Sequence, residues 1–168
     1  MQNSQPHTIL SLDIATTLGW AFSKDDKIIA WGVESFAVKF DSIHRSGLRL
    51  IKFRDWLMPF AGVSEVVYEQ VGADMRNLPA NETTYAMLGV VRMFCAGAMI
   101  PISSIHNSTL KKEFADNGRA DKHDMCRTAH RLGWRGGRPG TDQDHDACDA
   151  VALIYITQLR RGIKMGFE

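Results

Sequence analysis

The stretch "HTILSLDIATTLGWAFSK", residues 7–24, carries the pattern that decides the fold. Residues 7–15 alternate between apolar and polar side chains and are rich in strand-forming residues, which is typical of a β-strand. Thr16 and Thr17 begin a bend, and residues 19–24 have the pattern of a second strand. Because the connection is short, we expect the two strands to pair antiparallel.

The rest of the chain alternates between strand and helix patterns. Further strands are predicted at 28–38, 64–71 and 102–106. Helices are predicted at 42–60, 81–100, 108–115, 121–132 and 144–161, with Asn81 as the N-cap of the second. This order predicts an α/β fold in one domain spanning 1–168. Its five-stranded mixed sheet would contain an antiparallel meander of the first three strands, then two parallel strands, with helices against it.

Composition sets the broad class of the protein. The chain has 168 residues, enough for a hydrophobic core, and no apolar run long enough to span a bilayer. Its polar start lacks the pattern of a signal peptide. The three cysteines include no C-x-x-C pair, which argues against a disulfide or zinc framework. We therefore expect a cytoplasmic protein with reduced thiols and no membrane association.

The net charge of +1 hides a strong segregation of charge. Residues 107–140 contain eight basic and four acidic side chains, whereas residues 141–149 contain four aspartates and no lysine or arginine. A basic zone beside a concentrated acidic cluster is typical of a polyanion-binding surface around a cation site. From charge alone, two solvated helix faces explain the pattern equally well.

Four carboxylates occupy positions that suit metal ligands. Asp13 lies in the first strand, Glu69 lies at the end of the fourth, and Asp146 and Asp149 lie three residues apart on the last helix. That spacing places the last two on one helix face, and the first strand of a mixed sheet commonly pairs with the fourth. Grouped carboxylates repel each other unless cations lie among them, and such oxygen ligands suit Mg²⁺ or Mn²⁺. Two such ions about 4 Å apart are the usual device for phosphodiester hydrolysis.

Each of these acids also has a simpler interpretation. Asp146 would interact favourably with the positive N-terminal end of the helix dipole. Asp149 would cap a helix end or pair with an arginine, and Asp13 would stabilise the following turn. Asp142 and Asp144 are interpreted as solvated or capping residues.

Three further features leave two interpretations open. His145 is either a surface residue or a proton carrier beside the acidic pair. Trp134, in the basic loop "GWRGGRPG", either packs in the core or stacks on a base. The helix at 81–100 is apolar on more than one face, so the part turned away from the sheet is either a dimer surface or buried within the monomer.

Four motifs together resemble the RuvC-type Holliday junction resolvases, especially their phage-encoded relatives. They are "ILSLDIATTLGWAF", "YEQV", "LKKEFADNGRADKHDM" and "DACDAVAL", which follow the family's order over nearly the whole chain. The resemblance implies a ribonuclease H-like fold and a homodimer that cuts two opposed strands of a four-way junction. For a phage-encoded relative, the location would be the cytoplasm of the bacterial host.

The resemblance also implies roles for individual residues. The ligands of two Mg²⁺ ions, for which Mn²⁺ would substitute, would be Asp13, Glu69, Asp146 and Asp149. Lys111 and Lys122 would contact the region of the scissile phosphate, and Lys122 would help to stabilise transition-state charge. The residues expected to bind the DNA backbone are Lys111, Lys112, Arg119, Lys122, Arg127, Arg131, Arg135 and Arg138.

Two positions depart from the family's pattern. Cellular members usually have D-x-G in the first strand, whereas Asp13 is followed here by "IA". Many cellular members also place an aromatic residue after "EQV" that stacks at the junction centre, and this chain has Gly72 there. Met75 and Leu78 are candidates for that wedge. The residues therefore indicate nuclease chemistry more strongly than junction selectivity, and other branched DNAs are candidate substrates.

Three alternative functions use parts of the same pattern. A ribonuclease H acting on RNA–DNA hybrids would share the chemistry and differ in substrate geometry. A non-catalytic junction-binding protein would use the basic surface, but it would gain nothing from acids that face phosphates. An actin-like or sugar-kinase-type ATPase would need a second similar domain and a glycine-rich adenosine site. The chain has no room for these, so no nucleotide cofactor is expected.

Overall fold

The computed structural model describes residues 5–38, 44–71, 78–136 and 145–167. The elements, in chain order, are β1 (Thr8–Asp13), β2 (Thr17–Lys24), β3 (Lys27–Ser35), α1 (Arg45–Leu57), the 3₁₀-helix η1 (Met58–Phe60), β4 (Glu65–Gln70), α2 (Leu78–Gly97), β5 (Ile102–His106), α3 (Asn107–Ala115), α4 (Lys122–Arg131), α5 (His145–Leu159) and β6 (Gly166–Phe167).

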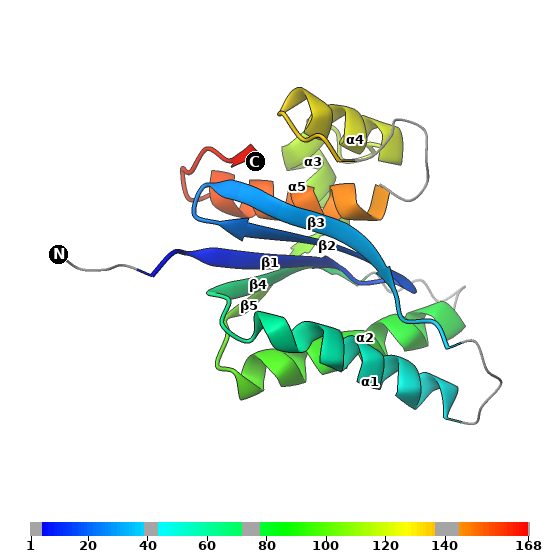
Figure 1. Ribbon diagram of the computed structural model, residues 1–168. Coiled ribbons are helices and arrows are strands. Elements are labelled where there is room, and N and C mark those ends of the chain that lie inside the picture. Colours follow the sequence, from blue (N-terminus) through cyan, green and yellow to red (C-terminus); the bar gives the residue numbers. More distant parts are fainter. Residues whose placement is uncertain (1–4, 39–43, 72–77, 137–144, 168) are drawn as a thin grey trace.

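The elements form three layers (Figure 1). The middle layer is a mixed sheet with the strand order β5-β4-β1-β2-β3-β6. Helices α1 and α2 lie on one face of the sheet, and α3, α4 and α5 lie on the other. Two separate hydrophobic cores result, one between each helical layer and the sheet.

Strand β1 lies inside the sheet, as the sequence predicts. It pairs antiparallel with β2 and parallel with β4, and β4 pairs parallel with β5. Its side chains alternate between the two cores, because Ile9 packs on the α5 side while Leu10 and Leu12 pack on the α1 and α2 side. By the same alternation, Ser11 and Asp13 face α5.

Helix α5 is the central helix of its layer and packs across β1, β2, β3 and β4. The apolar run from residue 150 to 154 is completely buried, which explains why this helix is hydrophobic on nearly all sides. The Ser11 hydroxyl donates a hydrogen bond of 2.7 Å to the carbonyl oxygen of Ala150 and so ties the helix to β1. No helix in the described part of the chain is long and apolar enough to cross a membrane.

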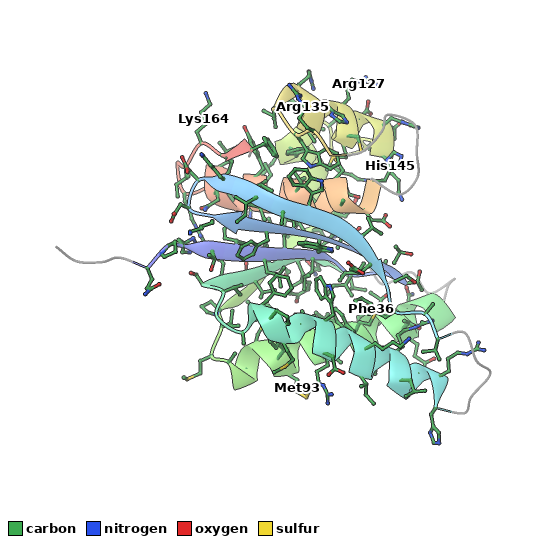
Figure 2. The ribbon with its side chains drawn as sticks, in the orientation of Figure 1. Phe36, Met93, Arg127, Arg135, His145 and Lys164 are labelled. Atoms are coloured by element: carbon green, nitrogen blue, oxygen red, sulfur yellow. The ribbon has the colours of Figure 1, made fainter. Side chains whose placement is uncertain are left out.

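Ion pairs hold the C-terminal end of α5. Arg160 donates two hydrogen bonds to Glu113 on α3, and Arg161 donates two to Glu65 at the start of β4. Figure 2 places Lys164, which follows this end, and His145, which begins the helix, at opposite ends of the layer. These ion pairs therefore connect α3 and β4 to the end of α5 that is distant from Asp146.

The structure corrects several sequence expectations. The sheet has six strands rather than five, because β6 adds two residues in parallel to β3. A strand of two residues has no periodicity that a sequence pattern could reveal. Helix α2 begins at Leu78, so Asn81 lies within its first turn and is not the N-cap. Strand β3 ends at Ser35 and α5 ends at Leu159, two to three residues before the expected ends.

Candidate active site

Two carboxylates lie side by side where β1 and β4 end. Leu12 and Tyr68 are partners in the parallel pairing of these strands, so the next residues, Asp13 and Glu69, are adjacent. Both lie on the sheet face that carries Ile9 and Val67, beneath α5. The expected proximity of Asp13 and Glu69 is therefore confirmed.

Helix α5 adds the other two carboxylates because its first turn reaches the sheet at Gly19. Gly19 is the β2 partner of Asp13, and a Cβ at residue 19 would overlap the carbonyl group of Asp146. Glycine is required here because the helix backbone passes directly over the strand. Gly19 was not among the predicted site residues, although an isolated glycine within a strand pattern is a signal of close backbone approach.

The pKa values show that the four carboxylates form one electrostatic cluster. Burial raises the pKa of Asp13 well above its usual value, and the charges of Glu69, Asp149 and Asp146 raise it further. Burial, followed by the charge of Glu69, raises the pKa of Asp149 to about 7. Without a cation, part of this cluster is therefore protonated near neutral pH.

Glu69 and Asp146 each interact with a polar or positively charged side chain. The Asn107 amide donates a hydrogen bond of 2.6 Å to Oε1 of Glu69. Burial raises the pKa of Glu69, while this hydrogen bond and the charge of Lys111 oppose the rise. Nζ of Lys122 lies 3.5 Å from Oδ1 of Asp146, and 63% of the lysine side chain is exposed. The two predicted lysines thus lie beside the carboxylate cluster, at positions 111 and 122.

The donor set fits a hard divalent cation in its chemistry. All four groups are carboxylates, they are only partly buried, and their mutual repulsion would be relieved by positive charge. Within the described residues, however, no three side chains of His, Cys, Asp or Glu lie close enough together to hold one ion. A cation would therefore have to draw these side chains together.

The predicted DNA-binding residues lie in the same layer as the cluster's helix. Those that are exposed are Lys112, Arg119, Lys122, Arg127, Arg131 and Arg135. Figure 2 shows Arg127 and Arg135 on the side of this layer turned away from the sheet. Lys111 is partly buried because it faces the carboxylates. Arg138, together with Asp142 and Asp144, falls outside the described residues.

Two of the open interpretations are decided by burial. His145 is 7% exposed, its Nδ1 lies 3.6 Å from Sγ of Cys126, and its ring contacts that of His123. The surface interpretation of His145 is therefore wrong, and its role as a proton carrier stays a prediction. Trp134 is fully buried and packs edge-on against Trp31, so it belongs to the core and is not presented to a base.

Helix α2 presents two large exposed apolar side chains away from the sheet, beside the exposed charged residues Glu82 and Arg92. Met87 and Val91 are buried against the sheet, whereas Tyr85 is 47% and Met93 60% exposed. Figure 2 shows Met93 on the outer side of its layer. This face is therefore not buried within the monomer. The candidate wedge residues cannot be placed, because Gly72 and Met75, like the side chain of Leu78, lie outside the described part.

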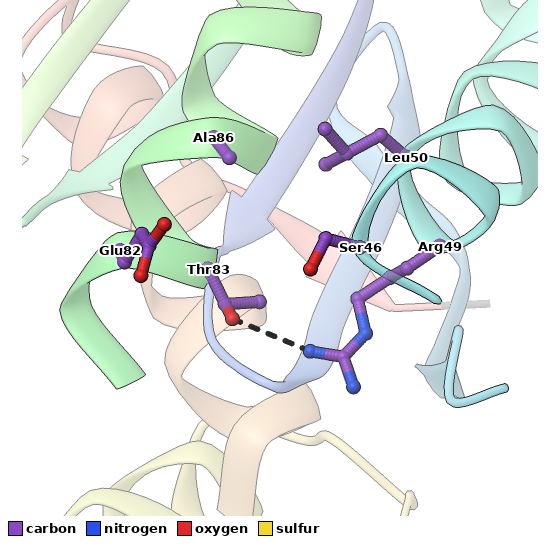
Figure 3. A pocket seen from close by; sticks show the side chains of 6 residues that line it. All are labelled: Ser46, Arg49, Leu50, Glu82, Thr83 and Ala86. Carbon is purple, nitrogen blue, oxygen red and sulfur yellow. Dashed lines mark hydrogen bonds between the residues drawn. The ribbon is translucent and has the colours of Figure 1, made fainter. Parts of the chain in front are cut away.

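A hollow of about 80 Å³ lies between the N-terminal parts of α1 and α2 (Figure 3). The side chains around it are Ser46, Arg49, Leu50, Glu82, Thr83 and Ala86. Nη1 of Arg49 donates a hydrogen bond of 3.4 Å to the Thr83 hydroxyl across it. Because α1 and α2 cover the sheet face opposite to the carboxylates, this hollow is separate from the candidate active site.

Comparison with known proteins gives matches only at the level of structure. No protein-family model matches the chain, and no curated protein matches its sequence. The structure of Thermus thermophilus RuvC in complex with Holliday junction substrate superposes with a TM-score of 0.69 and 18% identity, covering 94% of this chain and 97% of that chain. A second Thermus thermophilus RuvC structure gives a TM-score of 0.64 and 20% identity over 93% of this chain and 97% of that one.

The yeast mitochondrial Holliday junction resolvase Ydc2 is a further structural neighbour. It has a TM-score of 0.64 and 10% identity, and the match covers 86% of this chain and 75% of that chain. At sequence identities this low, the TM-scores show that the proteins share a fold and show nothing more. The resemblance to RuvC that the four motifs indicate is therefore confirmed for the fold: this chain has the mixed sheet and helical layers of RuvC.

Proposed function

We propose that residues 1–168 form a single nuclease domain that cleaves four-way (Holliday) junctions or other branched DNA. The observation that carries the proposal is the meeting of Asp13, Glu69, Asp146 and Asp149 in one electrostatic cluster on a RuvC fold. The RuvC structure that contains a Holliday junction substrate supports the substrate class. The enzyme would be an endodeoxyribonuclease that hydrolyses phosphodiester bonds.

In this proposal the four carboxylates would hold two Mg²⁺ ions, for which Mn²⁺ would substitute. The bound ions would activate water for attack and stabilise the leaving 3′ oxygen. The strand ends carry Asp13 and Glu69 on a rigid base, and the first turn of α5 carries the other two acids over them. The ammonium group of Lys122, at the exposed rim of the cluster, would contact the phosphate and stabilise charge as it develops.

DNA would lie along the layer of α3 and α4. The phosphate-binding residues in this proposal are Lys111, Lys112, Arg119, Lys122, Arg127, Arg131, Arg135 and Arg138. Contacts of this kind give affinity through charge and need little reading of base sequence, which suits an enzyme that selects a branched shape.

The active unit would be a homodimer that uses the exposed outer face of α2. Tyr85 and Met93 on this face are the large side chains that a second copy would cover. A two-fold axis in the protein would match the two-fold symmetry of the junction, so that two opposed strands are cut.

None of the three cysteines forms a disulfide, which fits a location in the reducing bacterial cytoplasm.

The test is cleavage of labelled DNAs by the purified protein in Mg²⁺, and then in Mn²⁺. The substrates are a four-way junction, a Y-fork, a linear duplex and an RNA–DNA hybrid, with Asp146→Asn as the inactive control. Paired nicks across the junction, absent from the linear duplex and the control, are the expected result. Cleavage of the hybrid alone would indicate a ribonuclease H, and junction binding without any cleavage would indicate a non-catalytic junction-binding protein.

A further inference from the structure

Glu69 differs from the other three carboxylates of the cluster in the length of its side chain. It is the single glutamate among three aspartates, so its carboxylate is separated from the backbone by one more rotatable bond. It also lies one residue before the end of β4, where β5 still pairs with the strand but the pairing with β1 has ended at Tyr68. A glutamate that serves a cation at such a position needs another side chain to hold it.

The amide of Asn107 meets this need. Its Nδ2 donates a hydrogen bond to Oε1 of Glu69 at 2.6 Å. A single accepted hydrogen bond leaves the other lone pairs of the carboxylate available to a cation. We propose that Asn107 is a positioning residue that orients Glu69 for metal binding, an inference that rests on the proposed function.

The backbone fixes Asn107 where this contact requires it. Ile105 on β5 is the strand partner of Glu69, and the chain passes from β5 directly into α3, which begins at Asn107. The side chain of His106, the residue between them, caps the helix by accepting a hydrogen bond from the backbone NH of Ser108. Since His106 is the cap, the side chain of Asn107 is not needed for that structural role and is available to Glu69.

An amide suits this position better than a charged group. A lysine would neutralise Glu69 and compete with the cation, and an aspartate would add a fifth negative charge to the cluster. The asparagine amide donates a hydrogen bond and carries no charge. It therefore orients the glutamate while leaving its negative charge available to the metal.

The test measures Mg²⁺ affinity without requiring cleavage. The melting temperature of each protein is followed while MgCl₂ is titrated, because an ion that binds only the folded state raises that temperature once its concentration exceeds the dissociation constant. The variants are Asn107→Ala and Asn107→Leu, which lack the donor, and Asn107→Gln, which keeps an amide on a longer side chain. Asn117→Ala is the matched control, since Asn117 follows the same helix and accepts a local hydrogen bond from the NH of Arg119.

We expect Asn107→Ala and Asn107→Leu to need about tenfold more Mg²⁺ or more to reach the same rise in melting temperature as the wild type. Asn107→Gln should fall between these variants and the wild type, Asn117→Ala should match the wild type, and junction affinity in the absence of divalent metal should stay within twofold. Cleavage by the donor-free variants should recover at high Mg²⁺. The leucine variant keeps the branched shape of the side chain, so it tests the proposal if the alanine variant folds poorly.

Two results would overturn the inference about Asn107 and leave the proposed function intact. One is a wild-type protein that responds to Mg²⁺ and cuts junctions while both donor-free variants respond at the same concentration within twofold. The other is equal weakening in Asn107→Gln and Asn107→Leu, because the amide donor would then not be the cause. If the wild type neither responds to Mg²⁺ or Mn²⁺ nor cuts any branched DNA, the proposed function falls and this inference falls with it.

Discussion

The backbone of Asp146 rests directly on Gly19, the strand partner of Asp13. This contact joins a strand near the start of the chain to a helix near its end. It sets the height of α5 above the sheet at the place where the four carboxylates gather. The geometry of the candidate active site therefore depends on a residue that has no side chain.

Replacing Gly19 with alanine should displace the first turn of α5. The added methyl group would meet backbone atoms of the helix, which cannot rotate away, so we expect a loss of about 1 to 3 kcal/mol in the free energy of unfolding. Junction cleavage should fall at least about tenfold, because small displacements of catalytic groups have large effects on rate. Urea denaturation and single-turnover cleavage would measure the two effects.

Gly47→Ala is the matched control for that experiment, since a Cβ at this position in α1 meets no other atom within 4 Å. It should leave stability unchanged or slightly raise it. If Gly19→Ala left both the free energy of unfolding and the cleavage rate unchanged, α5 would not need this close approach to the strand.

Asp149 should make the metal-free protein less stable as the pH rises. Its pKa of about 7 in the folded chain lies above the ordinary value of 3.8, so between these values the folded state holds a proton that the unfolded state has lost. The contribution of Asp149 to the free energy of unfolding is therefore fully present below about pH 4, and it is lost as the pH rises through about 7.

The substitution Asp149→Asn should consequently stabilise the metal-free protein at pH 8, by an amount on the order of 2 to 4 kcal/mol, and much less at pH 4. Urea denaturation in EDTA at both pH values would measure the difference. Added Mg²⁺ should stabilise the wild type at pH 8 more than the variant. Equal stability of the two proteins at pH 8 would contradict the burial of a charged group at this position.

Lys122→Ala should reduce cleavage much more than binding. The side chain lies at the exposed rim of the cluster, 3.5 Å from Asp146, where it would meet a phosphate. We expect the single-turnover cleavage rate to fall about 100-fold or more, with a few-fold loss in junction affinity measured without divalent metal. Lys27→Ala, an exposed lysine at the start of β3, is the control. Equal losses in rate and affinity would assign Lys122 to DNA binding alone.

Met93→Asp should dissociate the proposed homodimer. Met93 is 60% exposed on the outer face of α2, and a buried charge without a partner would oppose association. Sedimentation velocity should show a dimeric wild type and a monomeric variant, and paired junction cuts should become single nicks. Ile163→Asp, at a 37% exposed apolar residue beyond α5, should remain dimeric. A wild type that sediments as a monomer while making paired cuts would contradict the dimer proposal.

The sequence alone determined the features that depend on local periodicity. Alternation in residues 7–24 predicts a strand that carries Asp13, and the pattern of residues 64–71 predicts another strand with Glu69 near its end. The spacing of Asp146 and Asp149 puts both on one side of a helix. Backbone geometry repeats every two residues in a strand and every 3.6 in a helix, so a short window contains the necessary information.

The tertiary structure alone decided how these elements dock. The contact of Asn107 with Glu69 joins residues 38 positions apart, and the contact of Gly19 with Asp146 joins more distant ones. The burial of His145 and Trp134 and the pairing of β6 with β3 also depend on neighbours that are remote in the chain. Docking is set by how whole faces pack at close range, and no local pattern states which side chain of another element will lie opposite.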